Sequence, residues 1–240
     1  MKNIFLLLKI CLFSHCFFSC QDSLLDTASS EHGDEKTCAL SQAEGTISRI
    51  IADGSTINGK QYGFLVQSLY YLEARYPELE KVIEFIMNNR GPIMFKMNNN
   101  LAGDAAYNSH TIEFSNDYYI EPERLLEEIL HATQDIQYGY YNMQNAIKNV
   151  EFEARVLRDI WERKACEKEG IAPNCRGCAY HVEEYQQEYS TWIFSLSIPS
   201  LQSFPLQEFN TRTQTWYDPG YLYAVFNPSF HPQLITMFSF

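Results

Sequence analysis

The chain reads Leu125-Leu126-Glu127-Glu128-Ile129-Leu130-His131-Ala132-Thr133-Gln134 from residue 125 to residue 134. On a helix, at about 100° per residue, the leucines and isoleucines of this stretch fall on one arc and are expected to face the core. Glu127, Glu128 and His131 fall on the opposite arc. Because residues four apart share a helix face, Glu127 and His131 can present ligand atoms to one metal ion.

The segments on either side of this stretch predict further helices and two short strands. Pro122 suits the first turn of a helix, and the neighbouring glutamates favour the positive end of the helix dipole, so we expect a helix from Pro122 to about Ile136. Periodicity and breaking residues predict other helices at 62–75, 77–86, 144–168 and 180–195, and strands at 93–97 and 111–114. This order indicates an α+β fold. The tail after Ser203 contains four prolines and stays unassigned.

The sequence resembles the zincin metallopeptidases of the gluzincin type, whose active-site helix continues His-Ala-x-Gln and whose third metal ligand is a Glu on the next helix. The resemblance covers about residues 90–165, including the strand at 111–114 and the run Asn149-Val150-Glu151-Phe152-Glu153-Ala154. It implies a zincin-like fold, mainly helical, with a small sheet flanking the active-site helix. Glu127 stands where the family has its first zinc-binding His. Glu128 takes the position of the general base and His131 that of the second ligand.

The resemblance leaves two candidates for the third metal ligand. Glu151 follows His131 by twenty residues, as in thermolysin-type enzymes, but it shares a helix face with Arg155 and Arg158 that we expect to be solvated. Glu153 lies beside an apolar arc, where a carboxylate needs a partner or a metal. We therefore expect Glu153 as the third ligand, with Glu151 as the alternative. Such a set suits a divalent metal, although oxygen ligands weaken the preference for zinc.

Two functions follow from this resemblance. In the first, the protein is a metal-dependent peptide hydrolase in which the metal polarises a peptide carbonyl and Glu128 accepts the proton of a metal-bound water. In the alternative, the protein has this fold but no catalytic activity, and it binds a peptide or a glycan at the cell surface. Spacing alone also allows a third interpretation, in which Glu127 and His131 form an ordinary pair on a solvated helix face.

The N-terminus predicts export. Lys2 precedes an apolar stretch from Ile4 to Phe18 that is too short to span a bilayer, which is typical of a cleaved signal at residues 1–19. The end of this stretch, Phe17-Phe18-Ser19-Cys20, resembles the lipobox of bacterial lipoproteins in the looser form found in Bacteroidetes. The resemblance implies a lipidated Cys20 that anchors the protein in the outer membrane, on its periplasmic or its surface face. The alternative is an ordinary secretory signal.

Charge and composition describe the rest of the chain. Residues 20–37 are small, polar and acidic, which is typical of a tether, and residues 38–240 have the length of a single domain. Without the two lysines of the signal the chain carries 16 basic and 30 acidic residues, a net charge of −14. Such a charge disfavours nucleic acid as a partner. The partners we expect are the bilayer, through Cys20, and a peptide or protein substrate.

Four further cysteines remain in the predicted domain: Cys38, Cys166, Cys175 and Cys178. Because the predicted compartment is oxidising, an even number of cysteines favours two disulfides, with three ways of pairing them. The competing hypothesis is a zinc site, since three of these cysteines and His181 have finger-like spacing. A redox role for the Cys175–Cys178 motif is less favoured, because no strand precedes it.

Overall fold

The computed structural model describes residues 48–115, 119–170, 183–196, 204–221 and 223–239. They belong to a compact unit that spans Ser41–Phe240. The predicted signal, the predicted tether, Cys20, Cys38, Cys175, Cys178 and His181 lie outside the described residues. No helix in the described ranges is long and apolar enough to cross a membrane.

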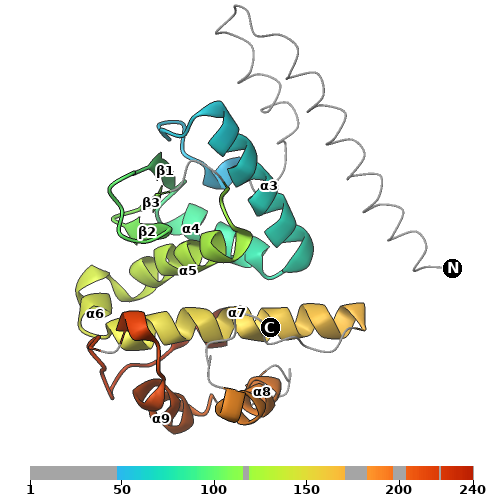
Figure 1. The fold of residues 1–240 in the computed structure, drawn as a ribbon, viewed down its shortest axis with the longest axis vertical. Helices are drawn as coiled ribbons and strands as arrows, with labels where there is room; N and C mark the ends of the chain where they lie inside the picture. Colours follow the sequence, from blue (N-terminus) through green and yellow to red (C-terminus); the bar gives the residue numbers. More distant parts are fainter. Residues whose placement is uncertain (1–47, 116–118, 171–182, 197–203, 222, 240) are drawn as a thin grey trace, which may run out of the picture. The chain divides into compact units, whose positions relative to one another are not determined.

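The described part of the chain is α+β and mainly helical, as the sequence predicts (Figure 1). Its elements are η1 (Ser48–Ile50), α3 (Gly59–Arg75), α4 (Leu79–Asn89), β1 (Met94–Met97), β2 (Ala105–Asn108), β3 (Thr111–Phe114), α5 (Pro122–Tyr138), α6 (Tyr140–Gln144), α7 (Ile147–Glu169), α8 (Glu183–Leu196), α9 (Leu206–Thr215), η2 (Pro219–Tyr221) and α10 (Gln233–Phe238). The predicted helices and both predicted strands are present, with bounds shifted by a few residues. Strand β2, helix α6, the 3-10 helix η1 and the helices of the tail were not predicted.

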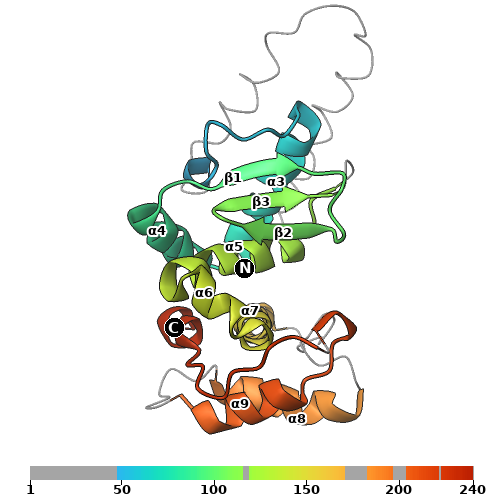
Figure 2. The same ribbon diagram turned by 90° about the vertical axis from the view of Figure 1, so that its left-hand side faces the viewer.

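The sheet has the order β1-β3-β2, with β1 parallel and β2 antiparallel to β3 (Figure 2). A two-residue turn joins β2 to β3, and both of its residues, Ser109 and His110, have positive φ values of 48° and 66°. Such turns match the twist of a hairpin. The side chains of Ala105–Asn108 show no alternating pattern, so this segment is a strand because the hairpin pairs it with β3.

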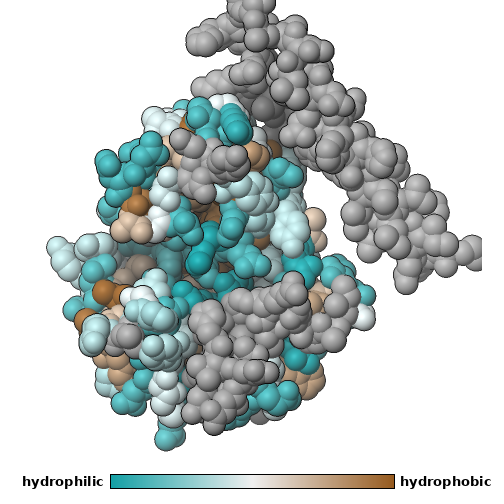
Figure 3. Space-filling view, viewed as in Figure 1, coloured by the Kyte–Doolittle hydropathy of each residue, from teal (hydrophilic) through white to brown (hydrophobic). Residues whose placement is uncertain are grey.

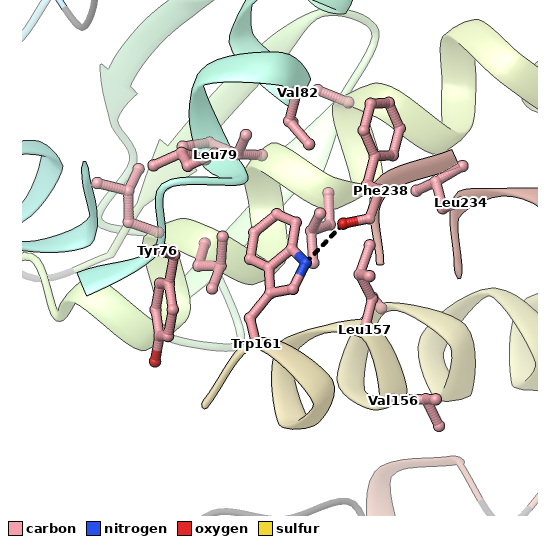
Figure 4. Close-up of a cluster of buried hydrophobic side chains, with 14 of the residues drawn as sticks. Tyr76, Leu79, Val82, Val156, Leu157, Trp161, Leu234 and Phe238 are labelled. Atoms are coloured by element: carbon pink, nitrogen blue, oxygen red, sulfur yellow. Dashed lines mark hydrogen bonds between the residues drawn. The ribbon is translucent and has the colours of Figure 1, made fainter. Parts of the chain in front are cut away.

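Helices α5 and α7 pack against each other at the centre of the unit. The sheet, α3 and α4 contact one side of α5, and α8 and α9 contact the far side of α7 (Figures 1 and 2). Helix α10 packs on α7, where the indole of Trp161 lies between Tyr76 and Phe238 and donates a hydrogen bond of 2.9 Å to the Phe238 carbonyl (Figure 4). Because both central helices are covered on several sides, their polar residues are buried together with their apolar ones.

Candidate functional site

A cavity of about 430 Å³ lies between strand β2, helix α5 and the beginning of helix α7. Hydrophilic residues gather across the middle of the face drawn in Figure 3. The cavity is lined by Gly103, Asp104, Ala105, Ala106, Tyr107, Arg124, Glu127, Glu128, His131, Met143, Gln144, Ile147, Val150, Glu151 and Tyr221. The cavity therefore brings together the three residues of α5 that the sequence singles out and one of the two glutamates of α7. Glu153 is not among the lining residues.

Glu127 forms ion pairs with two arginines. Arg158, on α7, binds Oε1 of Glu127, and Arg124, one turn earlier on α5, lies 3.1 Å from Oε2. Glu127 and Arg158 are 7% and 8% exposed. A solvated helix face is therefore the wrong interpretation for Glu127. Both of its oxygens are held by guanidinium groups, so a positive charge already stands where a metal ion would have to lie.

His131 has a partner at each ring nitrogen, a hydrogen bond at Nδ1 and an ion pair at Nε2. Gln134 donates its amide to Glu153 and to the Val150 carbonyl, so its oxygen, 2.8 Å from Nδ1 of His131, must accept the Nδ1 proton. Nε2 faces Oε2 of Glu151 at 3.5 Å. Burial by itself lowers the pKa of His131, but the carboxylates of Glu151 and Glu128 and the bond to Gln134 raise it to about 10. His131 is accordingly an imidazolium at neutral pH.

Glu151 is the carboxylate that faces His131, and the helix face on which it lies is not solvated. Burial by itself raises the pKa of Glu151, but His131 and a hydrogen bond from Tyr221 lower it. On the same face, Arg155 pairs with Asp218 at 2.8 Å and lies over the ring of Trp216. The sequence-based reason for rejecting Glu151, a solvated face, is therefore wrong.

Glu153 lies on the other side of Gln134, away from Nε2 of His131. It is fully buried and accepts hydrogen bonds of 2.8–2.9 Å from the Gln134 amide, the Tyr138 hydroxyl and the backbone N–H of Leu234. Burial raises its pKa to about 7, against the effect of these donors. As the sequence predicts, a carboxylate at this position has partners. These partners are hydrogen-bond donors of the protein and not a metal ion. These contacts do not support the choice of Glu153 as third metal ligand.

Glu128 is 8% exposed and forms no ion pair within the described residues. Burial is the main cause that raises its pKa to about 7. The charge of His131 and the backbone N–H of Tyr107 oppose this rise, whereas Glu151 and Glu127 add to it. Glu128 is therefore the acidic group of the cavity wall whose charge is least compensated.

These residues do not fit the metal centre that the resemblance implies. Across the described ranges, no three His, Cys, Asp or Glu side chains are arranged to hold a metal ion. Glu127 would have to give up Arg158, and His131 would have to lose its proton, before either could bind a cation. The donors that remain, His131 and Glu151, instead neutralise each other.

Of the four cysteines in the predicted domain, only one lies among the described residues. Cys166 lies on α7, is buried, and its Sγ is 3.4 Å from Oε1 of Glu162. Because the other three cysteines and His181 lie outside the described residues, the disulfides and the competing zinc site stay predictions.

Two residues of the site were missed by the sequence argument, Arg158 and Tyr221. Arg158 follows Glu151 by seven residues, two helix turns, so the spacing predicts that both lie on one helix face, but not that this face contacts α5. Tyr221 lies in a tail whose pattern was unassigned, so no signal pointed to it. Comparison with known proteins adds nothing here, since no family model, curated protein or solved structure matches the chain.

The protonation of His131 can be tested directly. We expect the NMR signals of its ring to remain those of an imidazolium at pH 8, because its pKa lies near 10. Replacing Glu151 with glutamine removes the facing negative charge and lowers that pKa. His110, whose pKa burial lowers, is the internal control and keeps its titration. A His131 that titrates near the ordinary histidine value of about 6.5 in both proteins would contradict the ion pair.

Proposed function

We propose that this chain is a cell-envelope lipoprotein, anchored through Cys20, whose zincin-like cavity binds an extended peptide without a metal ion. The observation that carries the proposal is the position of strand β2. It pairs with β3 along one edge, and Ala105, Ala106 and Tyr107 line the cavity. An open strand edge beside a cavity is a site at which an extended peptide can add a strand.

The register of the hairpin decides which backbone groups of β2 face the cavity. Asp104 accepts a hydrogen bond from the N–H of Ser115. Because the pairing alternates along an antiparallel ladder, Ala106 and Asn108 direct their backbone groups to β3, and Ala105 and Tyr107 direct theirs to the other side. The Tyr107 N–H lowers the pKa of the Glu128 carboxyl, which lies on the same side of the strand. The N–H and C=O of Ala105 and the C=O of Tyr107 are thus the groups available to a peptide.

Three features support a zincin-like scaffold. The helix that carries Glu127, Glu128 and His131 packs beside the antiparallel edge strand of the sheet. The next long helix supplies a glutamate, Glu151, that faces His131. The cavity lies beside this helix, where the resemblance expects the substrate, although β2 lines it in place of the strand at 111–114.

Replacing Ala105 with proline tests the proposal. The substitution removes the N–H that a peptide would bind and leaves the ladder to β3 intact, because that N–H takes no part in it. We expect about a tenfold loss of affinity for a short acetylated peptide of valine and threonine, measured by calorimetry, the effect of one main-chain hydrogen bond. The same peptide methylated on its backbone nitrogens should bind weakly to both proteins. Equal affinity of a folded Ala105→Pro variant would sink the proposal.

A metal-dependent peptide hydrolase is the second candidate. It is favoured by one observation, that His131, Glu151 and Glu128 lie together in the cavity wall. It requires Arg158 to leave Glu127, and the zinc experiment in the Discussion separates it from metal-free binding.

A further inference from the structure

We infer that the ligand of this cavity carries a cationic side chain, an ammonium or a guanidinium group, that pairs with Glu128. The inference rests on the proposed function, since it names the chemical class of the peptide that the cavity takes. It starts from the charges of the cavity wall, which are only partly compensated.

Two of the three buried glutamates in the wall already have cationic partners. Glu127 is paired with Arg158 and Arg124, and Glu151 faces His131. For Glu128, the described residues supply no ion pair, and the backbone N–H of Tyr107 only lowers the pKa of its carboxyl. Glu128 is therefore the one of these three glutamates with no cationic side chain at ion-pair distance, and the charge of His131 offsets only part of its own.

This charge is costly where it lies. The side chain of Glu128 is more than nine-tenths buried, and a buried carboxylate is stable only with hydrogen bonds and an opposite charge. Asp104, exposed at the cavity rim, adds negative charge at its entrance. A cationic group entering the cavity supplies the missing partner, whereas an anionic group meets repulsion.

The position of Glu128 suits a peptide residue paired with β2. Glu128 lines the same cavity as Ala105 and Tyr107, beside the strand edge that a peptide would use. A side chain of the paired peptide therefore lies beside it. Met143, Ile147 and Val150 provide an apolar wall for the methylene stem of a lysine or arginine, while the charged end reaches Glu128.

The experiment compares four peptides that differ at one position. The host is the valine–threonine peptide with a central lysine, arginine, norleucine or glutamate, and binding to the full chain is measured by calorimetry. We expect lysine and arginine to bind about ten- to a hundredfold more tightly than norleucine, the range of a close pair of opposite charges, and glutamate to bind most weakly. Glu128→Gln should abolish the lysine preference, so that the lysine and norleucine peptides bind the variant with equal affinity. Glu123→Gln, an exposed change of the same charge on the same helix, should keep it.

The outcomes separate the inference from the proposed function. If norleucine and lysine peptides bind equally, peptide binding stands and the cationic ligand is refuted. If the Glu128→Gln variant still prefers the lysine peptide, another group binds the cationic side chain and the assignment to Glu128 is wrong. If no peptide binds, both proposals fail together. If stoichiometric zinc blocks the lysine peptide, Glu128 belongs to a metal site and the inference is overturned.

Discussion

Replacing Glu153 with alanine is expected to lower the free energy of unfolding by about 4 kcal/mol. The carboxylate is fully buried and accepts hydrogen bonds from Gln134, Tyr138 and the Leu234 N–H. Its removal leaves these three donors without an acceptor inside the protein and opens a cavity between α7 and α10. Because Gln134 also orients His131, the variant should lose the fixed Nδ1 hydrogen bond of that ring as well.

The matched control is Glu167→Ala on the same helix. Glu167 is 46% exposed and pairs with Arg163 one turn away, so its loss should cost less than about 0.5 kcal/mol. Both variants are compared with the native chain by urea denaturation at neutral pH. If Glu153→Ala is no more destabilising than Glu167→Ala, the hydrogen bonds of Glu153 do not stabilise the fold, and Glu153 becomes a candidate metal ligand again.

A chain carrying both Glu127→His and Arg158→Met is expected to bind zinc more than about a hundredfold more tightly than the native chain. The first substitution restores an imidazole four residues before His131, a spacing that zinc accepts on a helix. The second removes the guanidinium that holds Oε1 of Glu127 in the native protein. Glu151 then lies within reach as a third ligand, because it already faces His131.

Glu127→His alone should gain little, because its imidazole would meet the buried guanidinium group of Arg158. Zinc affinity is measured by competition with a chromophoric chelator at neutral pH, and His131→Ala in the double variant is the control that should lose the metal. If the native chain itself binds zinc stoichiometrically, the metal-dependent hydrolase becomes the better proposal. A folded double variant without zinc affinity would show that the three side chains do not converge.

Local pattern predicted much of this fold for a physical reason. The apolar arc of α5, the proline at its start and the alternation of β3 reflect interactions within a few residues of the chain. They correctly predicted α5 and α7, the two long helices of the site, but not the short helix α6 between them. Strand β2 was not predicted because its conformation comes from pairing with β3. Helices α9 and α10 were not predicted because four prolines interrupt the pattern of their short apolar runs.

The sequence by itself determined that Glu127, Glu128 and His131 share one face of a helix, because that follows from helix geometry alone. Only the tertiary structure decided what this face meets. Glu151 and Glu153 are two residues apart and so point to different sides of α7, and periodicity assigned the arginine-rich side to solvent. Residues far along the chain, among them Asp218 and Trp216, cover that side, and buried pairs such as Arg158 with Glu127 replace water as the partners of its charges.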